Sequence, residues 1–449
     1  MKAFWARLTD FMETMHPVRF VALGYLSYVI VGWLLLWAPF THTAGSVSSL
    51  DALFTSTSAV STTGLVTVST GNDFNFIGQI IILALIQLGG IGYMTFGSFV
   101  VLSHSGTLSG RRQQIGSSVF SLPDGFRIDA FIKHVIAFTL ITEILGALAL
   151  FFVFTQAGLQ HPVWSAVFHS VSAFCTAGFS LYDNSFESLR DNTACNIILS
   201  LLSYMGAIGF IVFLDVWHRI TGKTSSVTLT TKVILSTTFW ISIIGIALFF
   251  LGDPSIRQMT VGKRLNAAVF QVMTSITTVG FNTIPIGGLS PASLFLIILL
   301  MVIGASPSGT GGGLKTTTFT ALIGVIKSVV SGRMEVQFWG RTIPAERVRV
   351  AVASLGFYMI SLITGCYLLA LTQSASFEKL LFEAASALGT VGLSTGITAA
   401  LTPVGKLIII ALMFLGRLGP LTFGMALFLP PPAQKPPKKR RNKTEDLAV

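Results

Sequence analysis

Four short segments of this chain combine threonine and glycine in one pattern, T-x-G followed by Leu or Phe. The copies are Thr62-Thr63-Gly64-Leu65, Thr176-Ala177-Gly178-Phe179, Thr278-Val279-Gly280-Phe281 and Thr390-Val391-Gly392-Leu393. Glycine readily adopts positive φ angles and adds no side chain, so it suits a tight loop that exposes its backbone. Such a loop offers carbonyl and threonine hydroxyl oxygens, and backbone carbonyls can replace the water shell of a cation.

The residues before each glycine also follow a shared register. Phe stands ten residues earlier in every copy, at Phe54, Phe168, Phe270 and Phe382. A hydroxyl residue stands six earlier, at Ser58, Ser172, Thr274 and Ser386. This agreement indicates a fourfold internal repeat. Helices that simply end in a glycine cap would explain one copy, but not four in register.

The ligand chemistry of these loops favours a weakly hydrated monovalent cation. Calcium and magnesium usually require carboxylates or retained waters, and no loop carries Asp or Glu between its threonine and the residue after its glycine. Potassium is the first choice, with a sodium or unselective monovalent cation route as the alternative. The predicted K+ filter consists of Thr62, Thr63, Gly64, Thr176, Ala177, Gly178, Thr278, Val279, Gly280, Thr390, Val391 and Gly392.

The composition is that of an integral membrane protein, with 52% hydrophobic and only 10% charged residues. The three cysteines, Cys175, Cys195 and Cys366, suggest neither a disulfide framework nor a zinc site. The histidines show no metal-binding spacing, and no nucleophile–base pair or cofactor fingerprint is found. We therefore do not expect an enzyme. A membrane-embedded enzyme or scaffold would cluster polar catalytic residues within helices, and the membrane charges Lys315 and Arg417 are too few and both basic for that.

Helices of two lengths must position the loops. Each loop is predicted to follow a helix of about ten residues, too short to cross a bilayer. These short helices are Leu50–Ala59, Val163–Phe174, Leu265–Ser275 and Phe377–Leu388. Long apolar segments precede them at Val21–Phe40, Phe131–Phe154, Thr230–Leu251 and Val348–Thr372. Others follow at Phe76–Leu102, Cys195–Trp217, Ala292–Lys327 and Val404–Leu429.

The expected fold is an all-α integral membrane protein of four covalently linked helix–pore-helix–filter loop–helix units around one pore. It would have eight transmembrane helices and four re-entrant pore helices. The four units span residues 20–102, 131–217, 230–327 and 348–429. The remaining segments are a lead at 1–19, loops at 103–130, 218–229 and 328–347, and a tail at 430–449.

Charge sets the predicted orientation. Most of the 29 Lys and Arg residues fall on the lead, the three loops, the tail and the adjoining helix ends. The positive-inside rule places these segments and both termini in the cytoplasm, with the glycine loops facing outside. The net charge of +11 is then explained by anionic lipid rather than by nucleic acid. The basic, Pro-rich tail is expected to be disordered, either as a topology anchor or as a docking site for lipid or a cytosolic partner.

One inner helix is interrupted by a Ser/Pro/Gly run at 305–317. Unwound backbone at membrane depth must be buried in protein or line a cavity, so a gate inside the pore is predicted. A phosphate-binding loop is the alternative, but the spacing before Lys315 does not fit one. The predicted gate residues are Ala305, Ser306, Pro307, Ser308, Gly309, Thr310, Gly311, Gly312, Gly313 and Lys315, together with Arg417.

Arg417 is the second departure from the repeat. The inner helices align on Gly89-Gly90, Gly206-Ala207, Gly304-Ala305 and Gly416-Arg417. The glycines permit close backbone approach, whereas a charge at mid-membrane costs at least roughly 2.5–3.5 kcal/mol. We expect Arg417 in the pore below the filter, as an electrostatic barrier to cations. The alternative is an ion pair with an acidic residue.

These motifs resemble a known family. The loops resemble the T-V-G-Y-G filter of potassium channels, but all four lie in one chain. Together with the Gly-rich segment from Gly304 to Thr317, the pattern resembles the Trk/Ktr/HKT superfamily of cation translocators. It is most similar to the KtrB group, the membrane subunits of bacterial Ktr potassium-uptake systems. Plant members often have Ser where this chain has Gly64, which the resemblance links to potassium preference.

The resemblance carries further expectations. It implies a homodimer with one pore per chain, in the inner (cytoplasmic) membrane of a bacterium. It implies a cytosolic ring of nucleotide-binding regulatory subunits of the KtrA type and a dependence of uptake on Na+. It assigns the gate role to the 305–317 loop and matches Arg417 to a pore arginine.

Other polar residues are weaker candidates. His169 and Glu383 each lie one residue after a repeat Phe and are expected to be packing or vestibule residues. The predicted topology places six acidic residues on the outer side, namely Asp51, Asp73, Asp183, Glu187, Asp191 and Asp253. They can gather cations before entry, although ordinary solvated charge is the simpler reading.

Overall fold

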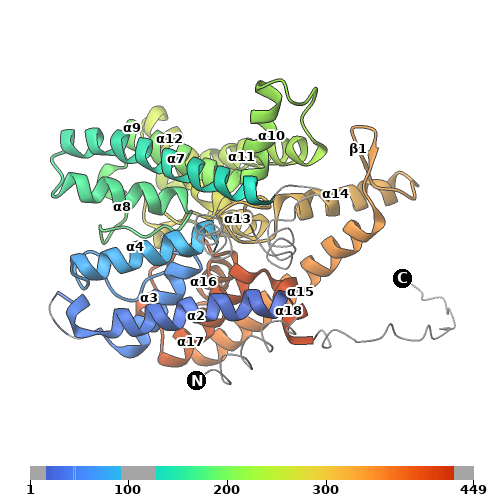
Figure 1. Cartoon of the computed structure of the whole chain (residues 1–449). Helices are drawn as coiled ribbons and strands as arrows, with labels where there is room; N and C mark the ends of the chain where they lie inside the picture. The colour runs from blue at the N-terminus through green and yellow to red at the C-terminus, as the bar shows by residue number, and fades with distance from the viewer. Residues whose placement is uncertain (1–16, 44, 46, 93–127, 429–449) are drawn as a thin grey trace, which may run out of the picture.

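The computed structural model describes residues 17–43, 45, 47–92 and 128–428, and these are mostly helical (Figure 1). Unit one contains α2 (Pro17–Trp37), α3 (Ser49–Val60) and α4 (Phe76–Ile91). Unit two contains α7 (Ile128–Gln156), α8 (Pro162–Phe174), α9 (Thr193–Ile208) and α10 (Phe210–Ile220). Unit three contains α11 (Leu229–Gly252), α12 (Val261–Thr277), α13 (Pro291–Ile303) and α14 (Thr316–Val330). Unit four contains α15 (Ala345–Thr372), α16 (Phe377–Gly389), α17 (Pro403–Leu418) and α18 (Pro420–Phe428).

Short elements complete the description. Single 3-10 turns lie at η1 (Pro39–Thr41), η2 (Glu187–Leu189), η3 (Pro254–Ile256), η4 (Ile286–Gly288) and η5 (Thr398–Ala400). The strands β1 (Gln337–Phe338) and β2 (Arg341–Thr342) pair as an antiparallel hairpin between α14 and α15. This hairpin projects from the body of the molecule (Figure 1).

The four short helices α3, α8, α12 and α16 lie within four residues of their predicted bounds. Local sequence explains several helix starts. The Ser48 hydroxyl accepts from the Asp51 amide at the start of α3, and the Asn75 amide oxygen accepts from Ile77 and Gly78 at the start of α4. Such caps satisfy amides that have no partner within the helix. The predicted positions of the short helices are therefore confirmed.

The inner helices differ from the prediction. Cys195–Trp217 was expected to be one helix, but α9 and α10 are bent by 92° about Gly209. Val404–Leu429 divides in the same way, with a bend of 100° after α17. Gly209 and Gly419 have φ angles of 96° and 83°, which a helix cannot accommodate. The prediction of a continuous inner helix in units two and four is therefore wrong, because one glycine with positive φ turns the chain by about a right angle there.

The other two inner helices stop at equivalent points. The α4 helix ends at Gly92, whose φ is 86°, and residues 93–102 of the predicted helix lie outside the described residues. In unit three the break runs from Gly304 to Lys315, as the Ser/Pro/Gly run predicts. In units two, three and four the inner helix is thus interrupted at or just after its aligned glycine, and in unit three the break is lengthened into a loop.

The four units are arranged in a closed ring. The inner helix of each unit contacts the short helix of the next, in the pairs α4–α8, α9–α12, α13–α16 and α17–α3. The last pair joins the two ends of the chain, so that the blue and red segments lie side by side in Figure 1. The loops that follow the short helices are thereby brought to one axis.

The outer surface suits lipid. Ile141, Leu145, Leu148 and Phe152 form one stripe along α7, and each is more than half exposed. Among the described residues, α2 from Arg19, α7 from Ile132, α11 and α15 are long and apolar enough to cross a membrane, and counting each bent pair as one span gives up to six. By length and composition, eight continuous spans are not found in the described residues.

Candidate ion pathway

The four T-x-G loops share one backbone conformation. The threonines Thr62, Thr176, Thr278 and Thr390 have φ angles between 49° and 60°, in the left-handed region. The glycines two residues later have φ angles between 66° and 92°. The residue between them is not among the positive-φ residues. The φ angle therefore changes sign from residue to residue through each loop, which is neither helix nor strand geometry.

Backbone N–H groups of each loop are tied back to the short helix that precedes it. The amides of Thr63, Ala177, Val279 and Val391 donate to the carbonyl oxygens of Ser58, Ser172, Thr274 and Ser386, at 2.8 to 3.1 Å. In units one and four the serine hydroxyl also accepts from the glycine amide, at 3.1 Å in each case. In unit two the Ser172 hydroxyl instead donates to the Phe179 carbonyl, and in unit three the Thr274 hydroxyl has no partner among the described residues, so this hydroxyl bonds to the loop in three units. The loop amides point away from the axis, which leaves its carbonyls available.

The glycines close the ring at the axis. A methyl group built on Gly64 would overlap the carbonyl oxygen of Ala177, and one on Gly178 would overlap that of Val279. In the same way Gly280 packs against Val391, and Gly392 packs against Thr63. Each loop therefore touches the next in chain order, and the fourth returns to the first. An alanine at any of these positions would collide with backbone.

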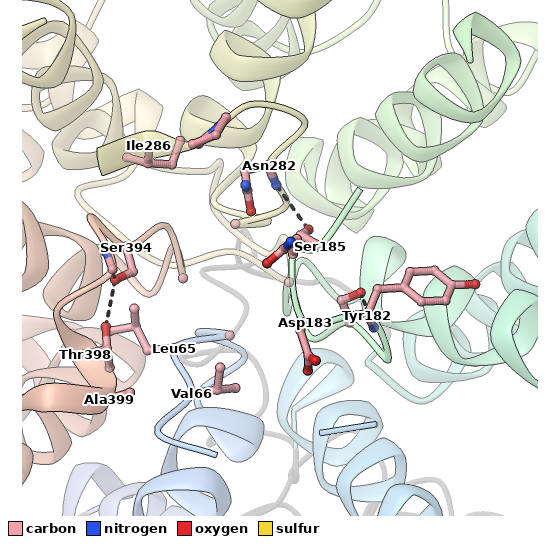
Figure 2. A pocket seen from close by; sticks show the side chains of 18 of the residues that line it. Leu65, Val66, Tyr182, Asp183, Ser185, Asn282, Ile286, Ser394, Thr398 and Ala399 are labelled. Atoms are coloured by element: carbon pink, nitrogen blue, oxygen red, sulfur yellow. Dashed lines mark hydrogen bonds between the residues drawn. The ribbon is translucent and has the colours of Figure 1, made fainter. Parts of the chain in front are cut away.

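A vestibule of about 600 Å³ opens on one side of the ring. All four glycines line it, together with residues that follow them in each unit. Figure 2 shows Leu65 and Val66 of unit one, Tyr182 and Asp183 of unit two, Asn282 of unit three and Ser394 of unit four around this space. The ring glycines thus form the floor of an open cup.

The charges in the vestibule wall are both negative. Asp183 and Glu187 line it, and no Lys or Arg is among the lining residues. Ser69 and Asn72 hydrogen-bond to Asp183, and Asn282 donates to Glu187 at 2.8 Å. Burial raises the pKa of Glu187 above its ordinary value, although the bond from Asn282 opposes this. Two of the six acidic residues predicted to lie on the outer side thus line the vestibule.

The other four predicted outer acids have structural partners. Asp51 forms a 2.6 Å ion pair with Lys406, and Asp191 forms one of 2.7 Å with Lys263. Asp73 accepts from the Ser69 amide, and Asp253 caps η3 through the Ser255 amide. Their geometry is that of structural contacts.

The loop between α13 and α14 lies directly under the ring. The Thr62 hydroxyl donates to the Thr310 carbonyl oxygen at 3.4 Å. The Thr176 hydroxyl lies 3.0 Å from the Thr310 hydroxyl. The Gly312 amide donates to the Thr278 hydroxyl at 3.3 Å, and a methyl group on Gly312 would overlap the Thr390 hydroxyl. One loop therefore touches the first threonine of all four T-x-G segments.

Contacts on the far side hold the loop in place. The Ser306 and Thr310 amides donate to the carbonyls of Ala207 and Gly206, at the end of α9. The Lys315 ammonium donates to the Gly311 carbonyl at 2.7 Å, folding back on its own loop. These bonds explain why residues 304–315 remain ordered without a helix. Unwound backbone in apolar surroundings needs such partners.

The guanidinium of Arg417 bridges this loop and the first unit. It donates to the carbonyl oxygens of Thr310 and Gly89, and to that of Gly90 at 3.3 Å. Its hydrogen-bond partners are backbone oxygens, and it forms no ion pair with an acidic residue in the described part of the chain. The ion-pair alternative is therefore not seen, and Arg417 lies beside the axis below the ring.

The small residues aligned on the inner helices behave as predicted in three units. A methyl group on Gly89, Gly206 or Gly416 would overlap the carbonyl oxygen at the end of the short helix of its own unit. In the third unit Gly304 instead packs against Gly312 and Gly313 of the loop. Sequence reasoning missed the glycines at the bends. A signal was present, because a glycine follows the aligned glycine by three residues at Gly92, Gly209 and Gly419, and each has positive φ.

Known proteins resemble the whole chain. The family described as TrkH, cation transport protein, matches residues 26–433. The Ktr system potassium uptake protein B of Bacillus subtilis is 33% identical over 424 residues, covering 93% of each chain. The protein of the same name from Vibrio alginolyticus is 34% identical over 92% of each chain. The potassium/sodium uptake protein NtpJ of Enterococcus hirae is 34% identical over 93% of this chain and 94% of its own.

A solved structure shares the fold. The crystal structure of the potassium transporter TrkH from Vibrio parahaemolyticus matches with a TM-score of 0.73 and 21% identity, covering 92% of this chain and 84% of that one. The sequence resemblance to the superfamily is thus confirmed over nearly the full length. The chain belongs to the TrkH family of membrane cation transport proteins.

Proposed function

We propose that this protein takes up potassium through the ring of four T-x-G loops, which acts as a carbonyl selectivity filter. The observation that carries the proposal is the closed contact of Gly64, Gly178, Gly280 and Gly392 at the floor of an open vestibule. Loop amides are directed into the short helices, so carbonyl oxygens are left for a dehydrated cation. The helix C-termini behind them add partial negative charge.

The vestibule is the outer entrance in this proposal. Asp183 and Glu187 raise the local concentration of cations there. The basic connecting segments lie on the opposite, cytoplasmic side by the positive-inside rule. Potassium would then enter from the vestibule, lose its water at the glycines and leave past the loop between α13 and α14.

That loop serves as the gate, and the arrangement described is its closed form. Residues 304–315 contact all four threonines, three of them through hydrogen bonds of 3.0 to 3.4 Å. Arg417 adds a positive charge at the same depth and holds Thr310 by its carbonyl. Opening requires the loop to leave the threonines and Arg417 to release it.

The partners follow from the resemblance to Ktr proteins. Relatives carry the name Ktr system potassium uptake protein, which implies a system of more than one subunit. We propose a homodimer with a pore in each chain, controlled by a cytosolic nucleotide-binding ring. The name of the Enterococcus hirae relative includes sodium, which supports Na+ as a coupling or activating ion.

Potassium-dependent growth tests the proposal. The chain is expressed in cells that lack their own potassium uptake, with and without a Ktr-type regulatory subunit, and with and without Na+. Growth at low external potassium and Rb+ uptake that other cations compete with poorly are expected. Uptake of Na+ in place of K+ would support the sodium or unselective alternative. Absence of any rescue with the regulator present would contradict potassium transport.

A further inference from the structure

The position nine residues before each filter glycine is polar and buried in every unit. It is occupied by Thr55, His169, Gln271 and Glu383, each no more than 1% exposed. The side chains of His169 and Glu383 reach the segment that follows the filter glycine of their own unit. A buried polar group usually needs partners, so what each one bonds to is informative.

In unit four, the carboxyl group of Glu383 accepts hydrogen bonds from the segment that follows the filter glycine. Its Oε1 accepts from the Ser394 hydroxyl at 2.8 Å, from the Thr395 amide at 2.9 Å and from the Thr395 hydroxyl at 3.1 Å. Its Oε2 accepts from the Thr398 hydroxyl at 2.7 Å. Ser394 and Thr395 are the second and third residues after Gly392. One carboxyl group thus fixes the mouth of the fourth loop to its own short helix.

In unit two, His169 makes the equivalent contacts with an imidazole. Its Nδ1 lies 2.7 Å from the Ser165 carbonyl and must donate to it, which leaves Nε2 as an acceptor. Nε2 accepts from the Ser180 hydroxyl at 3.1 Å and from the Leu181 amide at 3.2 Å. These are again the second and third residues after the filter glycine. Two unrelated side chains therefore make the same connection.

Units one and three lack this connection. The hydroxyl of Thr55 and both amide atoms of Gln271 are buried without a hydrogen-bond partner in the described structure. Thr283, the third residue after Gly280 and the counterpart of Thr395, also has an unpartnered hydroxyl. The position nine residues before the filter glycine thus bonds to the filter mouth in units two and four and does not do so in units one and three.

Units two and four, in which the short helix bonds to the filter mouth, face each other across that mouth. The ring contacts run in chain order, so units two and four occupy opposite places. Figure 2 shows the same arrangement, with Tyr182 and Asp183 across the vestibule from Ser394 and Thr398. The mouth is therefore bonded to its own short helices along one diagonal, between units two and four, whereas Asn282 of unit three is held instead by Ser185 and Glu187 of the neighbouring unit two.

We propose that Glu383 and His169 are positioning residues for ion discrimination, which keep the filter mouth from narrowing around Na+. In the cavity-size account of selectivity, a smaller ion is coordinated by the carbonyls only if the loops move inward. The bonds at Ser394, Thr395, Ser180 and Leu181 oppose that movement along the diagonal between units two and four. This inference rests on the proposed potassium function and assigns its selectivity to two residues outside the filter.

The test compares one substitution at equivalent positions. Glu383→Met and His169→Met remove the acceptors while keeping side-chain bulk, and Gln271→Met is the matched control because its amide has no partner. Rb+ uptake and its inhibition by Na+ are measured in potassium-uptake-deficient cells, normalised to protein in the membrane. For the first two variants we expect KM to rise and the Na+ inhibition constant to fall, each by about threefold to tenfold. Vmax per molecule is expected to change little, and Gln271→Met should match the wild type.

The outcomes separate this inference from the proposed function. Wild-type KM and Na+ inhibition in Glu383→Met and His169→Met would overturn the bracing, as would an equal shift in Gln271→Met. If Glu383→Met does not reach the membrane, Glu383→Gln decides, because it turns the acceptor facing Thr398 into a donor. A smaller shift in the same direction is then expected, and none would overturn the inference. Failure of the wild type and Gln271→Met to transport K+ would instead contradict the proposed function.

Discussion

At the scale of single residues, the guanidinium of Arg417 joins the loop between α13 and α14 to the end of α4. Arg417→Gln removes the positive charge from the pathway and weakens the hold on Thr310. Potassium flux without stimulation is expected to rise by roughly threefold to tenfold, equivalent to about 1 kcal/mol in the barrier. Rb+ uptake in cells without the regulatory subunit measures it. Wild-type kinetics in a normally assembled variant would contradict the pore position.

The filter glycines are tested by adding one carbon atom. Gly280→Ala places a methyl group against the Val391 carbonyl at a φ angle of 84°, so it distorts the ring and is expected to abolish uptake. Gly288→Ala is the control, since nothing lies within 4 Å of its added methyl group. Both proteins should reach the membrane in similar amounts. Normal uptake by Gly280→Ala would show that the ring is not the conducting path.

Glu187 should make uptake sensitive to external pH. Its raised pKa means that it takes up a proton at a higher pH than an ordinary carboxyl, so acidification removes one of two negative charges from the vestibule. KM for K+ is expected to rise about twofold as the pH falls, more at low salt than at high salt. Glu187→Gln should show the higher KM already at neutral pH, with less change on acidification.

Asp191→Asn provides the comparison for that variant. Asp191 is outside the vestibule, and the hydrogen bond from Lys263 lowers its pKa, so it stays charged over the same pH range. Its replacement should leave the pH profile unchanged. A profile that responds equally to both substitutions would point to general surface charge.

At the scale of elements, the loop between α13 and α14 can be tested by deletion. Removing Ser308–Gly313 takes away Thr310 and Gly312, which close on the four threonines. A leaky transporter is expected, with uptake in the absence of the regulator rising to at least the stimulated rate. Thr310→Val should give a smaller rise, because it loses only the hydroxyl contacts with Thr176 and Phe174. Intact regulation in the deletion variant would rule the gate out.

The helices and loops also show how much of the fold could be predicted from the sequence. Register at several offsets from the glycines was sufficient to place the short helices and the loops, because the repeat gives each position four observations. The bends at Gly209 and Gly419 were missed, although each glycine stands three residues after the aligned glycine of its unit and Pro420 follows Gly419, because the flanking apolar residues suggest a continuous helix. Bracing by His169 and Glu383 was missed because two different side chains serve one purpose. Such contacts depend on where the chain returns in space.

At the scale of the whole molecule, the ring closes only where the last unit meets the first. Asp51 in α3 and Lys406 in α17 are 355 residues apart and pair at 2.6 Å, with 15% of each side chain exposed. Burial alone would raise the pKa of Asp51, but hydrogen bonds from Lys406 and Ser48 lower it overall. The pair therefore joins the two ends of the chain while largely shielded from solvent.

A double-mutant cycle with Asp51→Asn and Lys406→Met measures that closure. We expect a coupling of about 1 kcal/mol in detergent at neutral pH, read from thermal denaturation midpoints. Because the pKa of Asp51 is lowered by folding, the contribution is present above about pH 4 and is lost as the pH falls through the folded value. The more exposed pair Asp191–Lys263 links units two and three and should show a coupling near zero. Equal coupling in both pairs would mean that ring closure gains nothing special from the Asp51 contact, and that the packing of α17 against α3 alone holds the ends together.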